Sequence, residues 1–320
     1  MALIGSSDLD VFPIGLGGNT FGFTADRDAT FAILDAWVAG GGNFVDTADS
    51  YSAWAPGNKG GESETLIGEW LTARGPAARE QLVVATKVAR HPEFPGLSPE
   101  NVRAAVDASL SRLRTDVIDL YYAHYDDPER DIDEIAATFG ELVSAGKVRY
   151  VAPSNFTPER IAAWVESARR QGAAVPVAVQ PYYNLVHRTE VEQSLIPVAQ
   201  QYGLSLVPYY GLEKGFLAGK YRSRELAPDA SPRAAQAVKY VTPEGLAIVD
   251  KLDEIALAHR VKPAAVALAW LRYQPTVVAP LASASRAEQV DDLLDAGRLA
   301  LAADEVEALT EVSAVLADVR

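Results

Sequence analysis

Short apolar runs alternate with segments of helical periodicity along the whole chain, and this alternation constrains the fold more than any other feature. Most of the runs are continuously apolar, which is typical of parallel strands covered on both faces. The runs are Pro13–Leu16, Asn43–Asp46, Leu82–Thr86, Val117–Tyr122, Val148–Ala152, Val177–Gln180, Leu204–Pro208 and Val277–Pro280. Eight strands alternating with helices predict one (β/α)8 TIM barrel domain over residues 1–320. A doubly wound sheet is the alternative, and the even spacing of eight units disfavours it.

Helix signals lie between these runs. Ser98, followed by Pro99 and Glu100, has the residue types of a helix cap and first turn, and Thr157 begins a similar segment. The connection between the last two strands is about twice as long as the others. We therefore expect the region of about 209–275 to carry extra helices, and Tyr221–Arg233 to form a loop over the barrel mouth.

The bulk composition excludes several classes of function. A net charge of −14 and a pI of about 4.8 repel nucleic acid and anionic membranes, so neither is an expected partner. The absence of cysteine excludes disulfides and thiolate chemistry. The N-terminus has no export signal, and no apolar run is long enough for a membrane span, so we expect a cytoplasmic protein. The sequence leaves the oligomeric state open.

Polar residues follow the predicted strands, where a barrel builds its active site. They are Asp46 and Tyr51 after the second strand, Lys87 after the third, His124 after the fourth, Ser154 and Asn155 after the fifth, Gln180 after the sixth and Tyr209 after the seventh. A lysine at the end of an apolar strand needs a partner, because burying its charge alone is costly. Asp46 is the candidate partner.

This set of residues suggests acid–base chemistry. A protonated Lys87 beside Asp46 favours ionisation of the Tyr51 phenol, which can then donate a proton to a carbonyl oxygen. His124 can orient the same oxygen. Taken singly, Asp46 can be a turn residue, Lys87 can extend toward solvent, and Tyr51 and His124 can be structural. Their occurrence at three consecutive strand ends favours catalysis.

An ordered set of motifs over almost the whole chain closely resembles the aldo-keto reductase superfamily. The motifs are "GGNFVDTADSY", "GESE" at Gly61–Glu64, "ATKV", "DLYYAHYD", "GKVRYVAPSNF", "VQPYYNLVHR", "GFLAGKY" and "ASASRAEQ". The resemblance implies a barrel that binds NADPH without a Rossmann domain and reduces aldehydes and ketones. It also implies that Tyr51 is the general acid of a tetrad with Asp46, Lys87 and His124, and that the partner is a small carbonyl substrate.

By the same resemblance, a second set of residues binds NADPH/NADP+. Ser154, Asn155 and Gln180 match residues that hold the carboxamide, Asp46 lies beside them, and Tyr209 matches the aromatic that stacks on the nicotinamide. Gly18 and Asn19 match backbone contacts near the ring. The loop Tyr210–Lys220 matches the pyrophosphate loop and contributes Tyr210, Gly211, Leu212, Gly215 and Lys220.

The segment implied to bind adenosine departs from the commonest family pattern. Ser283 replaces a usual glycine, and Ser285 stands where many relatives carry an arginine for the 2′-phosphate, with Arg286 one place later. Gln289 and Asp292 match adenine-side contacts. We expect NADPH, held through Arg286, Lys220 or an arginine of Tyr221–Arg233, and NADH is the alternative.

Phe21, Trp54 and Tyr125 flank the catalytic positions and are expected to line the substrate pocket, although packing explains each equally well. No long segment follows the final helical pattern, which suggests an open mouth and small or sugar-like carbonyls. Two other functions compete. One is a weakly active NADPH-binding sensor like the channel β subunits. The other is a metal-dependent hydrolase, which the absence of a clustered carboxylate or His-x-His pattern disfavours; no metal site is expected.

Overall fold

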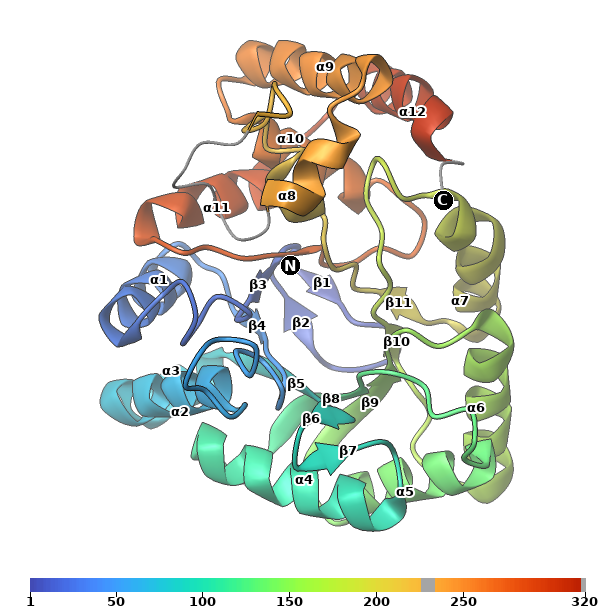
Figure 1. The fold of residues 1–320 in the computed structure, drawn as a ribbon. Helices are drawn as coiled ribbons and strands as arrows, with labels where there is room; N and C mark the ends of the chain where they lie inside the picture. Colours follow the sequence, from blue (N-terminus) through green and yellow to red (C-terminus); the bar gives the residue numbers. More distant parts are fainter. Residues whose placement is uncertain (226–233, 318–320) are drawn as a thin grey trace.

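A computed structural model, described here for residues 1–225 and 234–317, shows a closed barrel of parallel strands surrounded by helices (Figure 1). The barrel strands are β3 (Gly15–Gly17), β4 (Phe44–Asp46), β5 (Val83–Val88), β8 (Ile118–Ala123), β9 (Val148–Pro153), β10 (Ala178–Val179), β11 (Ser205–Leu206) and β12 (Leu281–Ala282). Six of them pair in the order β12-β3-β4-β5-β8-β9, and β10 pairs with β11. The bridges Ser154–Gln180 and Leu206–Val277 join the two groups. The predicted (β/α)8 barrel is confirmed.

Helices pack around the outside of this barrel. They are α1 (Arg27–Ala39), α2 (Glu62–Arg74), α3 (Pro76–Gln81), α4 (Pro99–Leu113), α5 (Ile132–Ser144), α6 (Pro158–Gln171), the π-turn η1 (Val191–Leu195) with α7 (Ile196–Tyr202), α10 (Pro263–Arg272), η4 (Ala287–Gln289) with α11 (Val290–Arg298), and α12 (Ala303–Ala317). The predicted caps form, since Ser98 accepts from the amide of Asn101 and Thr157 from that of Arg160.

The strand limits differ from the predicted ones by one or more residues, and the differences at β5 and β12 are the most informative. Lys87 lies inside β5 and not after it, because the strand continues to Val88 by pairing with β8. The last strand was expected to end at Pro280, but β12 begins one residue later. Pro280 lacks an N–H, yet its carbonyl accepts from the amide of Gly15 at 3.0 Å, so pairing with β3 continues past the proline.

Two hairpins mark opposite regions of the barrel. The N-terminal hairpin, β1 (Ala2–Leu3) and β2 (Asp10–Val11), lies against the beginnings of the barrel strands: the amide of Gly5 donates to Ser205 Oγ at 2.7 Å, and that of Phe12 to Asn43 Oδ1 at 2.7 Å. The second hairpin, β6 (Arg90–His91) and β7 (Phe94–Pro95), follows the carboxyl end of β5. Because the N-terminal hairpin covers the beginnings of the strands, their carboxyl ends remain available for a site.

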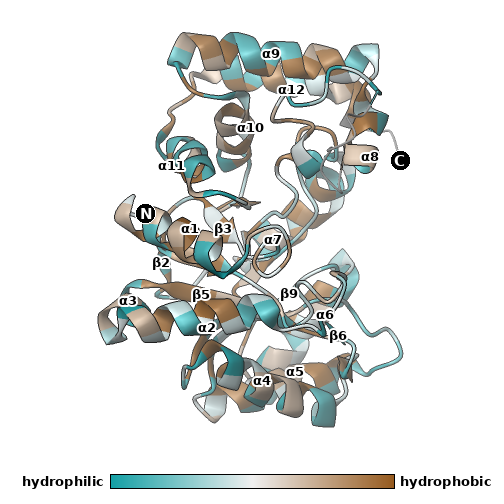
Figure 2. Ribbon diagram, turned by 60° about the vertical axis from the view of Figure 1, so that its left-hand side comes forward, coloured by the Kyte–Doolittle hydropathy of each residue, from teal (hydrophilic) through white to brown (hydrophobic). Residues whose placement is uncertain are grey.

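Hydrophobic side chains form two core layers, one inside the barrel and one between the strands and the helices. Figure 2 shows strands such as β5 in brown, whereas the surrounding helices carry both brown and teal residues. This pattern fits helices with one buried and one solvent-facing side. No helix in the described part of the chain is long and apolar enough to cross a membrane.

The long connection after β11 carries η2 (Glu213–Gly215), α8 (Ala234–Ala237), η3 (Val238–Tyr240) and α9 (Pro243–His259), followed by α10. Residues 226–233 of the predicted mouth loop Tyr221–Arg233 lie outside the described residues. In its described part, Arg222 pairs with Asp250 and Asp253 of α9, and Arg224 Nε donates to the carbonyl of Val241 at 3.1 Å.

Candidate active site

Asp46, Lys87 and Tyr51 form one hydrogen-bonded group at the carboxyl ends of β4 and β5. Because β4 and β5 are adjacent and parallel, their ends lie side by side, and the turn after β4 brings Tyr51 back over them. Lys87 Nζ donates to Asp46 Oδ2 at 2.6 Å, to the carbonyl oxygen of Thr47 at 2.7 Å and to the Tyr51 hydroxyl at 2.9 Å. These acceptors match the three donors of an ammonium group.

The Asp46–Lys87 pair is buried, with side chains 1% and 0% exposed. Burial lowers the pKa of Lys87 from its usual 10.5, while the charge of Asp46 opposes this shift. Burial likewise raises the pKa of Asp46, opposed by Lys87 and by the amide of Gln180, which donates to Asp46 Oδ1 at 2.9 Å. Each group thus offsets the desolvation cost of the other.

His124 follows β8, with its ring 6.1 Å from that of Tyr51 between centroids. Burial, and then the charges of Lys87 and Arg90, lowers the pKa of His124 well below 6.5. The imidazole is therefore neutral at pH 7, with one nitrogen that donates and one that accepts. Its Nδ1 is buried and finds no hydrogen-bond partner within residues 1–225 and 234–317.

The residues after β9, β10 and β11 form a polar network beside this group. The Ser154 hydroxyl donates to the carbonyl of Gln180 at 2.9 Å, and Asn155 Nδ2 donates to Ser154 Oγ at 3.0 Å and to the carbonyl of His124 at 2.9 Å. The Tyr209 hydroxyl donates to Asn155 Oδ1 at 2.7 Å. These bonds fix Tyr209 and the amide of Asn155 at the cavity wall.

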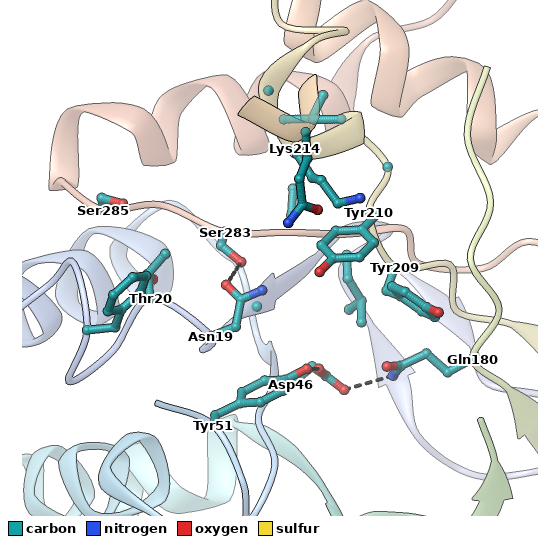
Figure 3. A pocket seen from close by; sticks show the side chains of 18 of the residues that line it. Asn19, Thr20, Asp46, Tyr51, Gln180, Tyr209, Tyr210, Lys214, Ser283 and Ser285 are labelled. Atoms are coloured by element: carbon teal, nitrogen blue, oxygen red, sulfur yellow. Dashed lines mark hydrogen bonds between the residues drawn. The ribbon is translucent and has the colours of Figure 1, made fainter. Parts of the chain in front are cut away.

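A cavity of about 990 Å³ runs from Tyr51 to the segment around Ser285 (Figure 3). Most of the predicted site residues line it. They are Asn19, Asp46, Tyr51, Trp54, His124, Tyr125, Ser154, Asn155, Gln180, Tyr209, Tyr210, Gly211, Leu212, Gly215, Lys220, Ser283, Ser285 and Gln289. Lys87 lies behind this wall and contacts it through Asp46 and Tyr51. The cavity is large enough for an elongated ligand.

Two residues expected at the catalytic end do not line the cavity. Phe21 is 0% exposed and packs in the core, and Phe23, two residues later, lines the cavity instead. Gly18 also packs behind the wall: its amide donates to the carbonyl of Asp46 at 2.7 Å, and a Cβ there would lie 2.8 Å from Ser63 Oγ. The glycine is thus required for close packing, while neighbouring Gly17 lines the cavity.

Of the residues predicted on the adenosine side, Ser283, Ser285 and Gln289 line the cavity. Arg286 is exposed and Asp292 pairs with Lys262 at 3.0 Å, and neither lines the cavity. Ser285 Oγ lies 3.0 Å from Thr24 Oγ1. Gln289 Oε1 accepts from the amide of Ser285 at 2.7 Å, because the segment folds into the short helix η4.

Lys214 is a cavity residue that the sequence reasoning did not single out. It lies in η2 with φ at 56°, and its side chain is 12% exposed. Its Nζ lies 5.0 Å from the Tyr210 ring centroid and 3.5 Å from Glu213 Oε1, and the group borders the cavity (Figure 3). A lysine flanked by glycine in a predicted anion-binding loop was the available signal.

At the open end, Trp54 and Tyr125 are 53% and 38% exposed. Trp54 contacts the rings of Phe23 and Tyr51, each at 6.1 Å between centroids, and Arg90 lies 4.3 Å from the centre of the Tyr125 ring. The mouth beside Tyr51 is therefore aromatic, and Arg90 adds a cation to it. Among the described residues, no group of three or more acidic or histidine side chains is arranged to hold a metal ion.

Comparison with known proteins agrees with this architecture. The sequence model of the Aldo/keto reductase family matches residues 13–314. The chain is 32% identical to the uncharacterized oxidoreductase YrpG of Bacillus subtilis, over 97% of this chain and 94% of that protein. It is 31% identical to Protein tas of Escherichia coli over 96% of both chains, and 30% identical to norsolorinic acid reductase B of Aspergillus parasiticus over 95% and 81%. The chain therefore belongs to the aldo/keto reductase family of oxidoreductases.

Proposed function

We propose that this protein reduces aldehydes and ketones to alcohols with NADPH, using Tyr51 as the proton donor. The observation that carries the proposal is the buried Lys87 ammonium, which bonds both the Asp46 carboxylate and the Tyr51 hydroxyl at one end of an elongated cavity. A proton donor of this kind must lie within hydrogen-bond reach of the substrate oxygen, and Tyr51 is at the cavity wall.

The residues along the cavity fit a nicotinamide cofactor. Asn155 and Gln180 place amide groups beside Tyr51, and Tyr209 offers a ring face held by its bond to Asn155. Lys214 and Lys220 line the cavity in a chain of net charge −14, where a diphosphate needs local cations. When bound, the cofactor supplies the hydride.

The chain's own groups handle the proton. Tyr51 donates its hydroxyl proton to the carbonyl oxygen, and Lys87, which donates to the phenolic oxygen at 2.9 Å, stabilises the phenolate left behind. Asp46 keeps Lys87 in the charged form. Neutral His124 offers an N–H to the same substrate oxygen, since its ring lies 6.1 Å from that of Tyr51 between centroids and both residues line the cavity.

We prefer NADPH to NADH, although Ser285 replaces the arginine that many relatives use. Arg286 is exposed next to Ser285 in the chain, and the Thr24 and Ser285 hydroxyls add donors on that side. The aromatic mouth formed by Trp54, Tyr125 and Phe23 suits small carbonyl compounds.

The test is a fluorescence titration of the protein with NADPH and with NADH, followed by a panel of small aldehydes. Tight NADPH binding with oxidation of the cofactor supports the proposal. Tighter NADH binding overturns the NADPH preference alone. Binding without oxidation by any aldehyde favours the alternative of a cofactor-binding sensor.

A further inference from the structure

The "GESE" motif at Gly61–Glu64 has no role in the site described so far, yet its side chains are unusually placed. Ser63 and Glu64 lie in the first turn of α2, and both are 0% exposed. An acidic residue in a first turn normally faces solvent, where it also complements the helix dipole. A fully buried Glu64 therefore needs specific partners, and its partners lead to Lys87.

Ser63 holds the segment that carries one acceptor of the Lys87 ammonium. The Thr47 hydroxyl donates to Ser63 Oγ at 2.8 Å, and the Ser63 hydroxyl donates to the carbonyl of Gly18 at 2.8 Å. The carbonyl of Thr47 is the oxygen that accepts from Lys87 Nζ at 2.7 Å. Ser63 thus ties β3 and β4 together next to the catalytic lysine.

Glu64 holds the neighbouring strand. Its Oε1 accepts from the Thr86 hydroxyl at 2.5 Å, and Thr86 directly precedes Lys87 in β5. Its Oε2 accepts from Arg112 Nε of α4 at 2.6 Å. Gly61 permits this approach: its φ is 85°, and a Cβ there would lie 2.4 Å from Arg112 Cδ. The motif therefore packs a charged pair against the back of the site.

Two ion pairs and one further buried carboxyl, that of Asp49, lie behind the site. Asp49 is 0% exposed, and both of its carboxyl oxygens lack hydrogen-bond partners in the described part of the chain. Burial, and then repulsion by Glu64, raises the pKa of Asp49 well above its usual 3.8. The two ion pairs are Asp46 with Lys87 and Glu64 with Arg112. The titratable groups around Lys87 are Asp46, Asp49, Tyr51, Glu64, Tyr122 and His124. Arg112 and Arg90 follow behind Glu64 and His124.

We propose that Glu64 and Arg112 are a positioning pair for Lys87: their contacts hold β5 beside Thr47, Glu64 favours the protonated lysine, and Arg112 opposes that effect. Neither residue touches the cavity, so both act through Lys87. The proposal rests on the proposed function only for its consequence for turnover.

The structure predicts opposite effects for the two members of the pair. Glu64→Gln leaves the Arg112 cation unpaired near Lys87, and a nearby like charge disfavours the ammonium. Arg112→Met leaves the Glu64 carboxylate unpaired, and this negative charge favours the ammonium form of Lys87. We expect the Lys87 titration midpoint to fall by about one pH unit in E64Q and to rise by a similar amount in R112M. R112K, which keeps the charge, should restore the wild-type midpoint.

The direct test is an NMR titration of protein labelled with ¹³Cε-lysine, with the Lys87 signal assigned by its loss in K87M. The pH dependence of turnover gives a second readout. Asp119→Asn is the matched control, since Asp119 is a buried carboxylate paired with Arg79 at 2.9 Å near the beginning of β8. D119N should leave the Lys87 midpoint unchanged. If E64Q does not fold, E64D is titrated instead, and a smaller downward shift is expected because the shorter carboxylate withdraws from Thr86.

Opposite shifts in E64Q and R112M support the positioning pair. Unmoved midpoints, or shifts in the same direction, overturn it, as does an equal shift in D119N. The outcomes for the two proposals are separable. Opposite shifts in a protein without turnover leave the pair supported and reject the reductase, whereas normal turnover with unmoved midpoints rejects the pair alone.

Discussion

Replacing Lys87 with methionine isolates the buried Asp46 carboxylate, and the consequence can be worked out from the structure. Lys87 and Asp46 are both buried, and the ammonium donates to Asp46 at 2.6 Å. Without it, Asp46 must remain charged and unpaired or take up a proton. Neutralising a carboxyl of ordinary pKa 3.8 at pH 7 costs about 4 kcal/mol. This is close to the ~3–5 kcal/mol typical of a buried pair that loses one partner. We therefore expect Lys87→Met to lose about 4 kcal/mol of stability at pH 7.

This loss has a characteristic dependence on pH. In the variant, burial without Lys87 holds the folded-state pKa of Asp46 above its unfolded value, so the folded state binds the extra proton. The stabilisation that this bound proton gives the folded variant is complete below pH 3.8 and is lost as the pH rises. The destabilisation relative to wild type should therefore shrink by about 1.4 kcal/mol per pH unit as the pH falls from 7 toward 5.

Urea unfolding of wild type and variant at matched pH values measures this difference. Asp46→Asn combined with Lys87→Met removes both charges and should recover most of the stability without recovering turnover. A stability difference that stays constant between pH 5 and 7, or a double variant as unstable as the single one, would refute the account of the buried pair.

Three further predictions concern other parts of the site. The pKa of His124 is held well below 6.5 in the folded protein, so the unfolded state binds a proton at this group first as the pH falls. The free energy of unfolding should therefore decrease below pH 6.5 by up to about 1.4 kcal/mol per pH unit. His124→Gln should remove that slope in urea titrations. Lys214→Met should weaken binding of both cofactors by about tenfold and reduce its salt dependence, whereas Lys239→Met, outside the cavity lining, should not. Ser285→Arg should raise NADPH affinity about tenfold and leave NADH affinity unchanged, as measured by fluorescence titration; equal gains for both cofactors would contradict a 2′-phosphate contact.

The sequence was informative wherever chemistry follows strand periodicity. Continuous apolar runs predict the strands, and the carboxyl ends of adjacent parallel strands must meet, so Asp46, Lys87 and His124 could be brought together from their positions alone. The exact strand limits were not predictable. Lys87 lies inside β5 and β12 begins only after Pro280, because pairing with a neighbouring strand decides where a strand begins and ends.

Side-chain direction in loops was the least predictable feature. Phe21 and Phe23 lie in the same loop and have the same chemistry, yet Phe21 packs in the core and Phe23 lines the cavity. Only the bonds around the turn, such as the Ser52 hydroxyl donating to the carbonyl of Phe21 at 2.7 Å, decide between them. Lys214 was missed for a similar reason, since its left-handed backbone conformation is what places its ammonium at the cavity.

The central claim is that Tyr51 donates the proton, and Tyr51→Phe tests it most directly because it removes one oxygen and keeps the ring. Pre-steady-state oxidation of NADPH by a small aldehyde should be slowed at least about 100-fold, while the NADPH dissociation constant stays within about twofold of wild type. Turnover near the wild-type rate in the variant would contradict the account, because another group would then be the donor.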